Sequence, residues 1–179
     1  MSDTTSTSGT AGPALASGQG FVVQGDESRW GEAMHTSAEH VWTKVSQKDT
    51  GGAWSLFESR VPAGFGVPLH LHHAQEEWFW VLKGEFEFEV GGAVNRLGPG
   101  ASQFAPRQVP HRWRKSGDAD GVMLILAQPS AGMEDFFDRF AQLSPEQLQD
   151  FGYLNGLFAE CGMEVVGPPL PPSDDLSAQ

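Results

Sequence analysis

The sequence predicts an all-β barrel or sandwich with two α-helices packed outside it. Up to about residue 128 the chain consists of short apolar segments separated by Gly and Pro, which is typical of β-structure. After residue 128 the apolar residues recur with the helical period of 3.6. With 179 residues, 39% of them hydrophobic, the chain is large enough for one domain with one core. It contains no internal repeat, which favours one barrel over a tandem pair.

Composition divides the chain into four parts. Residues 1–20 are nearly all Ser, Thr, Gly and Ala, so they bury too little apolar surface to offset the entropy of ordering, and we expect a flexible tail. Residues 21–128 form the barrel, which begins with an N-terminal arm, and residues 129–166 form the C-terminal helices. Residues 167–179 are a Pro-rich tail that we expect to be non-regular.

Eight strands are expected in the barrel. One of them, Glu85–Val90, alternates strictly between apolar and acidic residues, so one of its faces is wet. By contrast, Trp78–Leu82 is apolar on both faces and must be covered twice, by the barrel interior and by a second subunit or the N-terminal arm. This predicts a homodimer. The expected strands are Val41–Ser46, Ala53–Val61, Pro68–His73, Glu77–Lys83, Glu85–Val90, Ser102–Ala105, His111–Lys115 and Val122–Ala127.

Two helices are expected after the barrel. The first covers residues 132–143, where five apolar residues form one helical stripe: Met133, Phe136, Phe137, Phe140 and Leu143. A second begins at Ser144 as N-cap, with Pro145 at the first helical position and Gln147 placed to close a capping box. It is expected to end at Gly162. Its predicted buried residues are Leu148, Phe151, Leu154 or Tyr153, Phe158 and Cys161.

Charge and cysteine content exclude several classes of protein. The net charge is −12, with 11 Lys and Arg against 23 Asp and Glu, which disfavours binding to nucleic acid or to an anionic membrane surface. Cys161 is the single cysteine, so neither an intramolecular disulfide nor a four-cysteine zinc site can form. The N-terminus lacks the charged and apolar regions of a secretory signal, and no apolar stretch is long enough to span a bilayer. We therefore expect a cytoplasmic protein.

Four side chains have the types and spacing of a metal site. Side chains alternate along a strand, so His70 and His72 point to the same side, roughly 6–7 Å apart at the backbone. Glu77 opens the neighbouring antiparallel strand after a short turn, and His111 starts another strand after a proline-rich turn. A barrel can bring these strands together around one ion, with room left for water or substrate. Glu76 replaces Glu77 as ligand if the turn is one residue shorter, and His73 faces away by parity.

These residues also carry a resemblance to a known family. The pattern Gly64-x5-His70-x-His72-x4-Glu77-x6-Gly84 resembles the first cupin motif at every signature position. A second pattern, Gly100-x5-Pro106-x-Gln108-x2-His111-x3-Lys115, resembles the second cupin motif in its Gly, Pro and His. It departs where Gln108 replaces the usual Gly and Lys115 replaces the usual Asn, and neither position is a ligand. The resemblance covers about residues 35–128.

The resemblance implies the fold and the chemistry. The fold is a single double-stranded β-helix, the cupin jelly-roll barrel, and the helices that follow it resemble those of quercetinase-like single-domain bacterial cupins. It implies that His70, His72, Glu77 and His111 bind one divalent transition metal ion. The donor set suits Fe, Mn, Ni, Co, Cu or Zn and does not choose among them.

Three functions follow from such a site. The first is a metal-dependent dioxygenase of quercetinase type, with O2 as co-substrate and an apolar or aromatic, enol- or catechol-like small molecule as substrate. The second is a non-redox isomerase, cyclase, dehydratase or lyase, and the third is a non-catalytic small-molecule-binding cupin. In either enzyme Glu77 can act as general base. We expect Phe79, Phe104 and Trp113 to line the pocket, which suits an apolar substrate.

Overall fold

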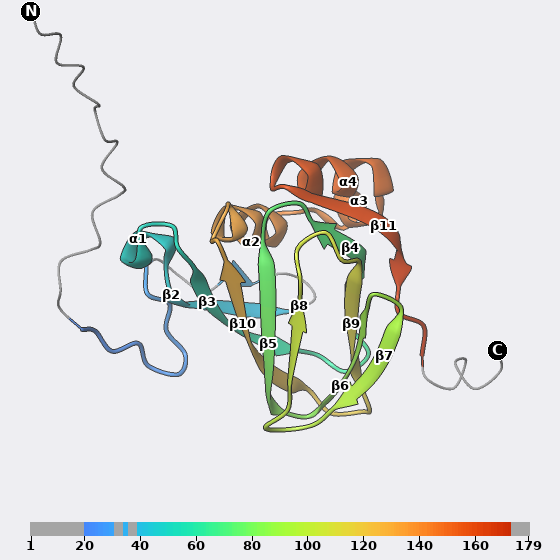
Figure 1. Ribbon diagram of the computed structural model, residues 1–179, viewed down its shortest axis with the longest axis horizontal. Coiled ribbons are helices and arrows are strands. Elements are labelled where there is room, and N and C mark those ends of the chain that lie inside the picture. Colours follow the sequence, from blue (N-terminus) through green and yellow to red (C-terminus); the bar gives the residue numbers. More distant parts are fainter. Residues whose placement is uncertain (1–19, 31–33, 36–38, 173–179) are drawn as a thin grey trace, which may run out of the picture.

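Two antiparallel β-sheets face each other, and three of the helices lie together at one end of them (Figure 1). The structure is a computed structural model and describes residues 20–30, 34–35 and 39–172. The first sheet has the order β1 (Met34–His35), β2 (His40–Val45), β3 (Ser55–Val61), β10 (Gly121–Gln128), β5 (Glu76–Lys83) and β8 (Ser102–Ala105). The second has the order β11 (Met163–Pro169), β4 (Pro68–His72), β9 (His111–Ser116), β6 (Glu85–Val90) and β7 (Ala93–Leu97). The helices are α1 (Gln47–Thr50), α2 (Met133–Ala141), α3 (Pro145–Gln149) and α4 (Phe151–Glu160).

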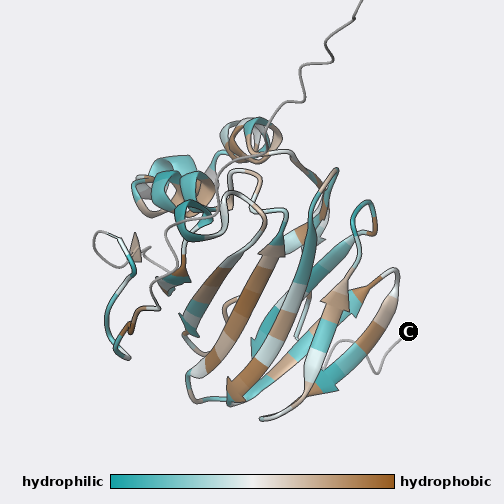
Figure 2. Ribbon diagram, turned by 60° about the vertical axis from the view of Figure 1, so that its left-hand side comes forward, coloured by the Kyte–Doolittle hydropathy of each residue, from teal (hydrophilic) through white to brown (hydrophobic). Residues whose placement is uncertain are grey.

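This arrangement confirms the predicted fold class, and the alternation of residue types explains it. Hydrophilic and hydrophobic bands alternate along the strands in Figure 2. In β3 every second residue is buried, and its partner β10 repeats the pattern. The registers Phe57↔Ile125 and Ile125↔Phe79 place these three side chains in one row on the inner face of the first sheet. The core therefore lies between the sheets, where a period of two sends apolar side chains.

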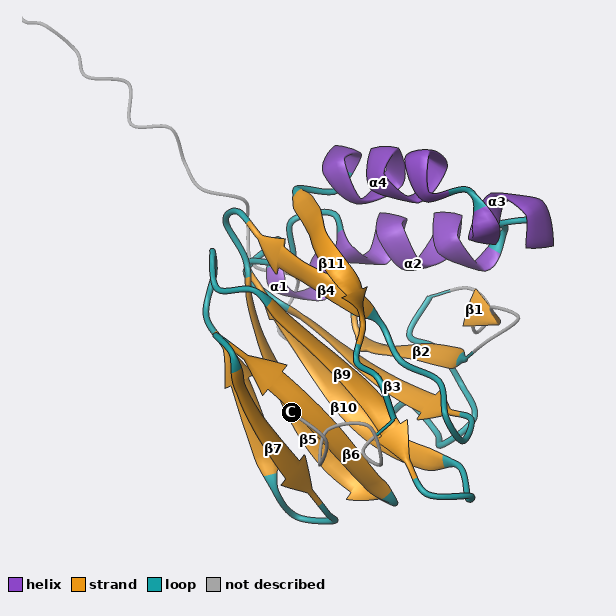
Figure 3. Ribbon diagram, turned by 90° about the vertical axis from the view of Figure 1, so that its right-hand side faces the viewer, coloured by secondary structure: helices purple, strands orange, loops and turns teal. Residues whose placement is uncertain are grey.

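The helical end of the molecule is fastened to the sheets by buried polar contacts. Glu134 in the first turn of α2 accepts hydrogen bonds from the hydroxyls of Ser46 and Ser55. Gln75, in the turn between β4 and β5, donates to the carbonyl oxygens of Pro129 and Ser130 just before α2. Figure 3 shows α2, α3 and α4 over the ends of β4 and β11. The helices are thereby held above the end of the barrel at which β4, the strand that carries His70 and His72, lies.

The predicted start of the second helix is confirmed, but that helix is interrupted. Ser144 caps α3 with a full capping box to Gln147, and Pro145 is at the first helical position. Asp150 then adopts an extended conformation, ends α3 and caps α4 by accepting from the backbone N–H of Tyr153. The prediction that Phe151 is buried is wrong, because this break turns its ring outward, to 58% exposure.

The expectation of a non-regular segment from residue 167 is also wrong in part. Residues Met163–Pro169 form β11, which pairs antiparallel with β4 along the edge of the second sheet. An edge strand tolerates proline because one row of its N–H groups needs no partner. The register shifts at Gly167 and again at Pro169, as expected where the ladder is interrupted. The predicted boundary at residue 166 therefore falls inside a strand.

Several short elements were not predicted from the sequence: β1, β7 and α1. The expected flexible tail, residues 1–20, lies outside the described residues except for Gly20. Residues 173–179 of the expected Pro-rich tail also lie outside them. None of the helices in the described ranges is long and apolar enough to cross a membrane.

Candidate metal centre

Three strands bring four buried side chains to one point between the sheets. His70 and His72 come from β4, Glu77 from β5 and His111 from β9, where His111 lies directly opposite His70. One ligand atom from each lies within 4.8 Å of the others. All four are at most 6% exposed. The structure thus brings together the four residues that the sequence singled out.

Backbone carbonyls orient two of the imidazoles. His70 Nδ1 lies 2.8 Å from the carbonyl oxygen of Pro68, and His111 Nδ1 lies 3.0 Å from that of Val109. A carbonyl oxygen only accepts, so each Nδ1 carries a proton, and in the neutral ring Nε2 then keeps a lone pair. This is the arrangement in which histidines bind metals, with the second ring nitrogen fixed by a hydrogen bond.

Glu77 lies at the centre of the cluster. Its Oε2 is 2.9 Å from Nε2 of His111 and 3.2 Å from Nε2 of His72. Burial by itself would raise the pKa of Glu77, but the charges and hydrogen bonds of His72 and His111 outweigh it and hold that pKa well below the usual range. Burial, followed by the neighbouring His111 and His72, lowers the pKa of His70 to about 3. Glu77 is therefore ionised and His70 is neutral at physiological pH.

The geometry of the cluster fits a divalent cation. The contact of His111 Nδ1 with the carbonyl oxygen of Val109 directs Nε2 toward a carboxylate oxygen of Glu77, 2.9 Å away. Two acceptors at that separation repel each other unless a proton or a cation lies between them. His72 Nε2 lies 3.2 Å from the same Oε2 of Glu77, so a second imidazole nitrogen meets this oxygen. Three buried imidazoles and one carboxylate that converge in this way fit a transition metal ion.

A largely apolar cavity of about 280 Å³ adjoins the cluster. His70 and Glu77 form part of its wall, with Phe79 from β5 and Trp113 from β9. The helices close it with the apolar residues Met133, Phe136, Phe137, Phe140, Leu148, Leu154 and Phe158. Among the described residues that line it, none is Lys or Arg. The predicted helical stripe thus covers the cavity, which suits an uncharged apolar ligand.

Phe104, in contrast, does not line this cavity, and that prediction is wrong. The register of β8 against β5 pairs Glu77 with Ala105 and Trp78 with Phe104. Ala105 consequently shares the inner face with Glu77, whereas Phe104 points outward and is 50% exposed.

The two residues beside the cluster lie outside it. Glu76 forms an ion pair with Arg107, with 2.9 Å between their charged atoms, so Glu77 and not Glu76 enters the cluster. The His73 side chain is 58% exposed and lies 3.8 Å from Glu164. His73 therefore faces away from the cluster, as strand parity predicts, and Glu76 is the first residue of β5.

The two departures from the second cupin motif have structural explanations. Gln108 adopts a positive φ of 62°, the conformation for which glycine is normally used, and its N–H donates to the carbonyl oxygen of His72. Lys115 is buried at the other end of β9, where its ammonium group donates to the carbonyl oxygen of Ser116. Neither substitution displaces a residue of the cluster.

One buried carboxyl group at the cavity, that of Glu39, was not predicted from the sequence. It directly precedes β2 and is 5% exposed. The alternation that buries Val41 and Thr43 on one face extends to position 39, and this was the available signal.

One segment of the chain matches a known family model. Residues 57–127 match the family model described as "Cupin domain". Protein SchB of Streptomyces halstedii is 31% identical over 88 residues, which cover 48% of this chain and 64% of that protein. Dimethylsulfoniopropionate lyase DddQ of Ruegeria pomeroyi is 42% identical over 67 residues, which cover 37% of this chain and 32% of that protein. The matched segments thus span less than two thirds of either relative.

Solved structures are similar to about half of the chain at low sequence identity. The polyketide cyclase RemF from Streptomyces resistomycificus is 23% identical, with a TM-score of 0.46 over 52% of this chain and 67% of that one. KdgF from a Halomonas species is 21% identical, with a TM-score of 0.47 over 51% of this chain and 79% of that one.

Proposed function

We propose that this chain, which contains a cupin domain, is a metal-dependent enzyme that acts on an apolar, enol- or catechol-like small molecule. The observation that supports this most directly is a cluster of three histidines and one glutamate in the wall of an apolar cavity. The first candidate reaction is oxidation or oxidative cleavage of the substrate by O2, as in a dioxygenase.

His70, His72, Glu77 and His111 would hold the metal ion. When bound, such an ion supplies Lewis acidity toward a substrate oxygen, and a redox-active ion also supports electron transfer to O2. The Nδ1–H groups of His70 and His111 keep these rings in the tautomer that metal binding requires. The carboxylate of Glu77 reaches the cavity wall, where it can accept the proton of a substrate hydroxyl.

The charge and the aromatic content of the cavity lining favour one class of substrate. Without Lys or Arg among the described lining residues, it offers no fixed counter-charge to a phosphate or a carboxylate. Phe79, Trp113 and Phe158 present aromatic surface on which a flat ring can pack. An aromatic or enolic molecule with an oxygen directed at the cluster satisfies both conditions.

A non-redox reaction is the second candidate, that of a lyase, cyclase, isomerase or dehydratase. Two observations favour it. DddQ, the relative that is 42% identical over its matched segment, is named as a lyase. A second carboxyl group, that of Glu39, also lines the cavity, and proton transfer between two positions is what such reactions need. In this case the ion that His70, His72, Glu77 and His111 would hold would supply Lewis acidity to a substrate carbonyl, and O2 would take no part.

The experiment that separates the two candidates follows substrate loss and O2 consumption together. Protein loaded in turn with Fe, Mn, Co, Ni, Cu or Zn is supplied with a panel of catechols and enols, in air and under anaerobic conditions. O2 consumption in proportion to substrate loss supports the dioxygenase. Equal turnover without O2, or full activity with Zn, supports the non-redox enzyme. Binding without turnover under any of these conditions contradicts the enzyme proposal and leaves a small-molecule-binding protein.

Adjacent glutamates supply a matched control for any activity found. Glu77→Gln removes the carboxylate from the cluster, and we expect turnover to fall at least about 100-fold because the metal loses a charged ligand. Glu76→Gln makes the same chemical change one residue away, on the outer face, and should leave turnover within about twofold. Equal losses in the two variants would place the active centre elsewhere.

A further inference from the structure

The helical residues that line the apolar cavity are of two kinds, buried and partly exposed. Beside the histidine cluster, the Phe158 ring of α4 packs edge-on against His70, with 5.7 Å between the ring centroids. The Phe136 ring of α2 packs edge-on against Phe158 at 5.0 Å, and both phenylalanines are buried. Three other helical residues of the lining are partly exposed, and we call them the outer end of the cavity: Phe140, Leu148 and Leu154.

Helix geometry places the outer end away from the cluster. Phe140 follows Phe136 by one turn of α2, and their rings stack at 5.6 Å. Leu154 precedes Phe158 by one turn of α4. Each step corresponds to about 6 Å along the helix axis. Both steps lead toward α3, which carries Leu148 and lies at one end of the pair formed by α2 and α4 (Figure 3). The cavity therefore extends from the cluster, between α2 and α4, toward α3.

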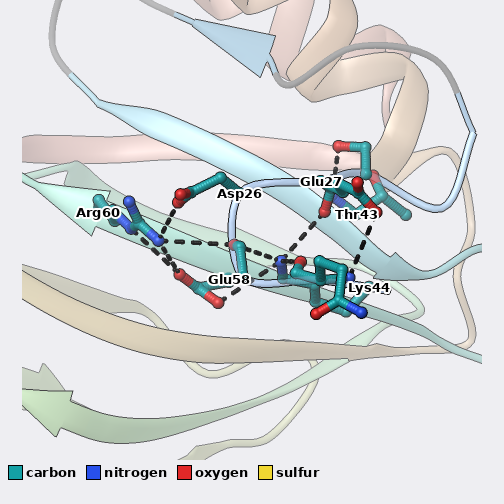
Figure 4. Close-up of polar contacts among 9 residues, drawn as sticks. Asp26, Glu27, Thr43, Lys44, Glu58 and Arg60 are labelled. Carbon is teal, nitrogen blue, oxygen red and sulfur yellow. Dashed lines mark hydrogen bonds and ion pairs between the residues drawn. The ribbon is translucent and has the colours of Figure 1, made fainter. Parts of the chain in front are cut away.

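The side of the cavity formed by the arm is held by charged contacts (Figure 4). Arg60 on β3 pairs with Asp26 of the arm and with Glu58. The arm also meets β2, where the Lys44 ammonium group donates to three backbone carbonyl oxygens, those of Gln24, Gly25 and Glu27. The arm is thus fastened to β2 and β3, the strands on this side of the cavity, and a ligand that extended in this direction would have to break several contacts.

The helices α3 and α4, by comparison, are held mainly by apolar packing. Among their described side chains, Glu160 alone forms an ion pair with another element, at 2.7 Å from Arg139 of α2. The two side chains are 64% and 44% exposed, and such exposed pairs contribute little to stability. The outer end is therefore the part of the cavity whose surroundings can adjust to a ligand most readily.

The outer end suits a tail that is both apolar and uncharged. Its three side chains are hydrocarbon, so they leave a polar group of a ligand without a hydrogen bond. The helical segment around it, residues 133–160, contains six acidic residues and one basic residue, Arg139. Since Arg139 is paired with Glu160, this segment repels an anionic ligand.

We propose that Leu148 and Leu154 are specificity-determining residues, which bind an apolar tail of the substrate at the outer end of the cavity. The substrate is then a molecule of two parts, an enol- or catechol-like head at the cluster and a hydrocarbon tail directed toward α3. The position of the head rests on the proposed function, whereas that of the tail rests on the cavity lining and the helix geometry.

A pair of probes that differ by a hydrocarbon tail tests this proposal. Catechol supplies the head alone, and 4-butylcatechol adds a butyl tail. Dissociation constants are measured by titration calorimetry on the full chain loaded with Zn, under anaerobic conditions so that the probes are not oxidised. A buried methylene group strengthens binding about fourfold, so we expect the wild type to bind 4-butylcatechol at least about 30-fold more tightly than catechol.

Three variants locate the tail. Leu154→Trp fills the outer end from α4 and should reduce the gain to less than about threefold, while catechol still binds within about twofold of the wild type. Leu148→Trp fills the same space from α3 and should have the same effect. Tyr153→Trp is the matched control, because Tyr153 is adjacent to Leu154 but is 42% exposed and does not line the cavity, and it should retain the gain.

Four results would overturn the proposal. They are equal affinity of the wild type for both probes, no binding of either probe, a gain that persists in both Leu154→Trp and Leu148→Trp, and loss of catechol binding in both. The proposed function fails separately. A gain that depends on Leu154 in a protein that turns over no substrate would refute the enzyme and keep the tail site. Turnover of catechols without a gain from the tail would keep the enzyme and refute the tail site.

Discussion

At the scale of single residues, the site depends on where two protons lie. The Nδ1–H groups of His70 and His111 are held by backbone carbonyls, which leaves the Nε2 atoms to face Glu77 and the cavity. Strand parity explains why these rings point inward, but the tautomer is set by carbonyls that belong to the residues two positions earlier, Pro68 and Val109. Each of these two histidines is therefore oriented by the backbone carbonyl two residues before it. This local arrangement does not require a bound metal.

Glu39 leads to a prediction about the pH dependence of stability. Because its pKa is about 7 in the folded protein and near 4.5 in an unfolded chain, the folded state holds the proton more tightly. The resulting stabilisation is fully present below pH 4.5 and is lost as the pH rises through 7. Relative to Glu39→Gln, the wild type should lose about 3 kcal/mol of unfolding free energy over this window.

Urea denaturation of the two proteins at a series of pH values measures this difference. The comparison between variants cancels the contributions of the other titrating groups. A difference that stays constant with pH, or that grows in favour of the wild type as the pH rises, would show that Glu39 is not a buried carboxyl group.

At the scale of elements, the turn between β8 and β9 joins the second sequence motif to the first through a hydrogen bond. Its residue Gln108 donates to the carbonyl oxygen of His72 and has a φ of 62°, which costs a non-glycine residue about 1 kcal/mol. We expect Gln108→Gly to raise the free energy of unfolding by up to about 1 kcal/mol, since glycine adopts this conformation without that cost. Gln108→Ala, which keeps the strained backbone, should give no such gain. Chemical denaturation compares the two, and a destabilised Gln108→Gly would contradict this reading of the turn.

The sequence predicted the elements that have a regular apolar period. Short apolar segments separated by Gly and Pro located the eight main barrel strands to within two residues at each end, and the Ser144 capping box located the start of α3. The break at Asp150 was missed because the apolar residues before and after it continue the same helical stripe. β11 was missed because its prolines suggest a coil, whereas pairing at a sheet edge is a tertiary effect.

The four residues of the cluster could be predicted more fully than the residues around it, because local strand periodicity places some of them whereas pairing between strands places the others. Parity within one strand is sufficient to place His70 and His72 together. Whether Phe104 faces in or out depends on the register of β8 against β5, which a single sequence does not contain. To place Glu39 at the cavity, one would have to know that β2 and β5 belong to the same sheet, with two strands between them.

At the scale of the whole molecule, the outer face of the first sheet is unusually apolar. Trp80, Leu82 and Phe104 are 40%, 46% and 50% exposed, and they lie on the paired strands β5 and β8. The described part of the arm makes its hydrogen bonds and ion pairs to β2, β3 and α1. In the first sheet β10 separates β2 and β3 from the strands that carry this patch. We therefore expect a second copy of the chain to cover the patch and form a homodimer.

Light scattering coupled to size-exclusion chromatography tests the dimer at micromolar concentration. Trp80→Glu should shift the wild-type dimer to monomer, because a charge cannot be buried at the interface without a partner. Val94→Glu changes a residue of similar exposure, 45%, on β7 and should leave the dimer intact. A monomeric wild type, or dissociation by both variants alike, would remove this interface.

The central claim, that the cluster binds a metal ion, is tested most directly by elemental analysis of the tag-free protein. The wild type is compared with His72→Ala and His73→Ala, two adjacent histidines of which only His72 belongs to the cluster. We predict close to one equivalent of a transition metal in the wild type and in His73→Ala, and almost none in His72→Ala, with all three proteins folded by circular dichroism. A wild type that stays metal-free after reloading, or equal metal content in all three proteins, would contradict the claim.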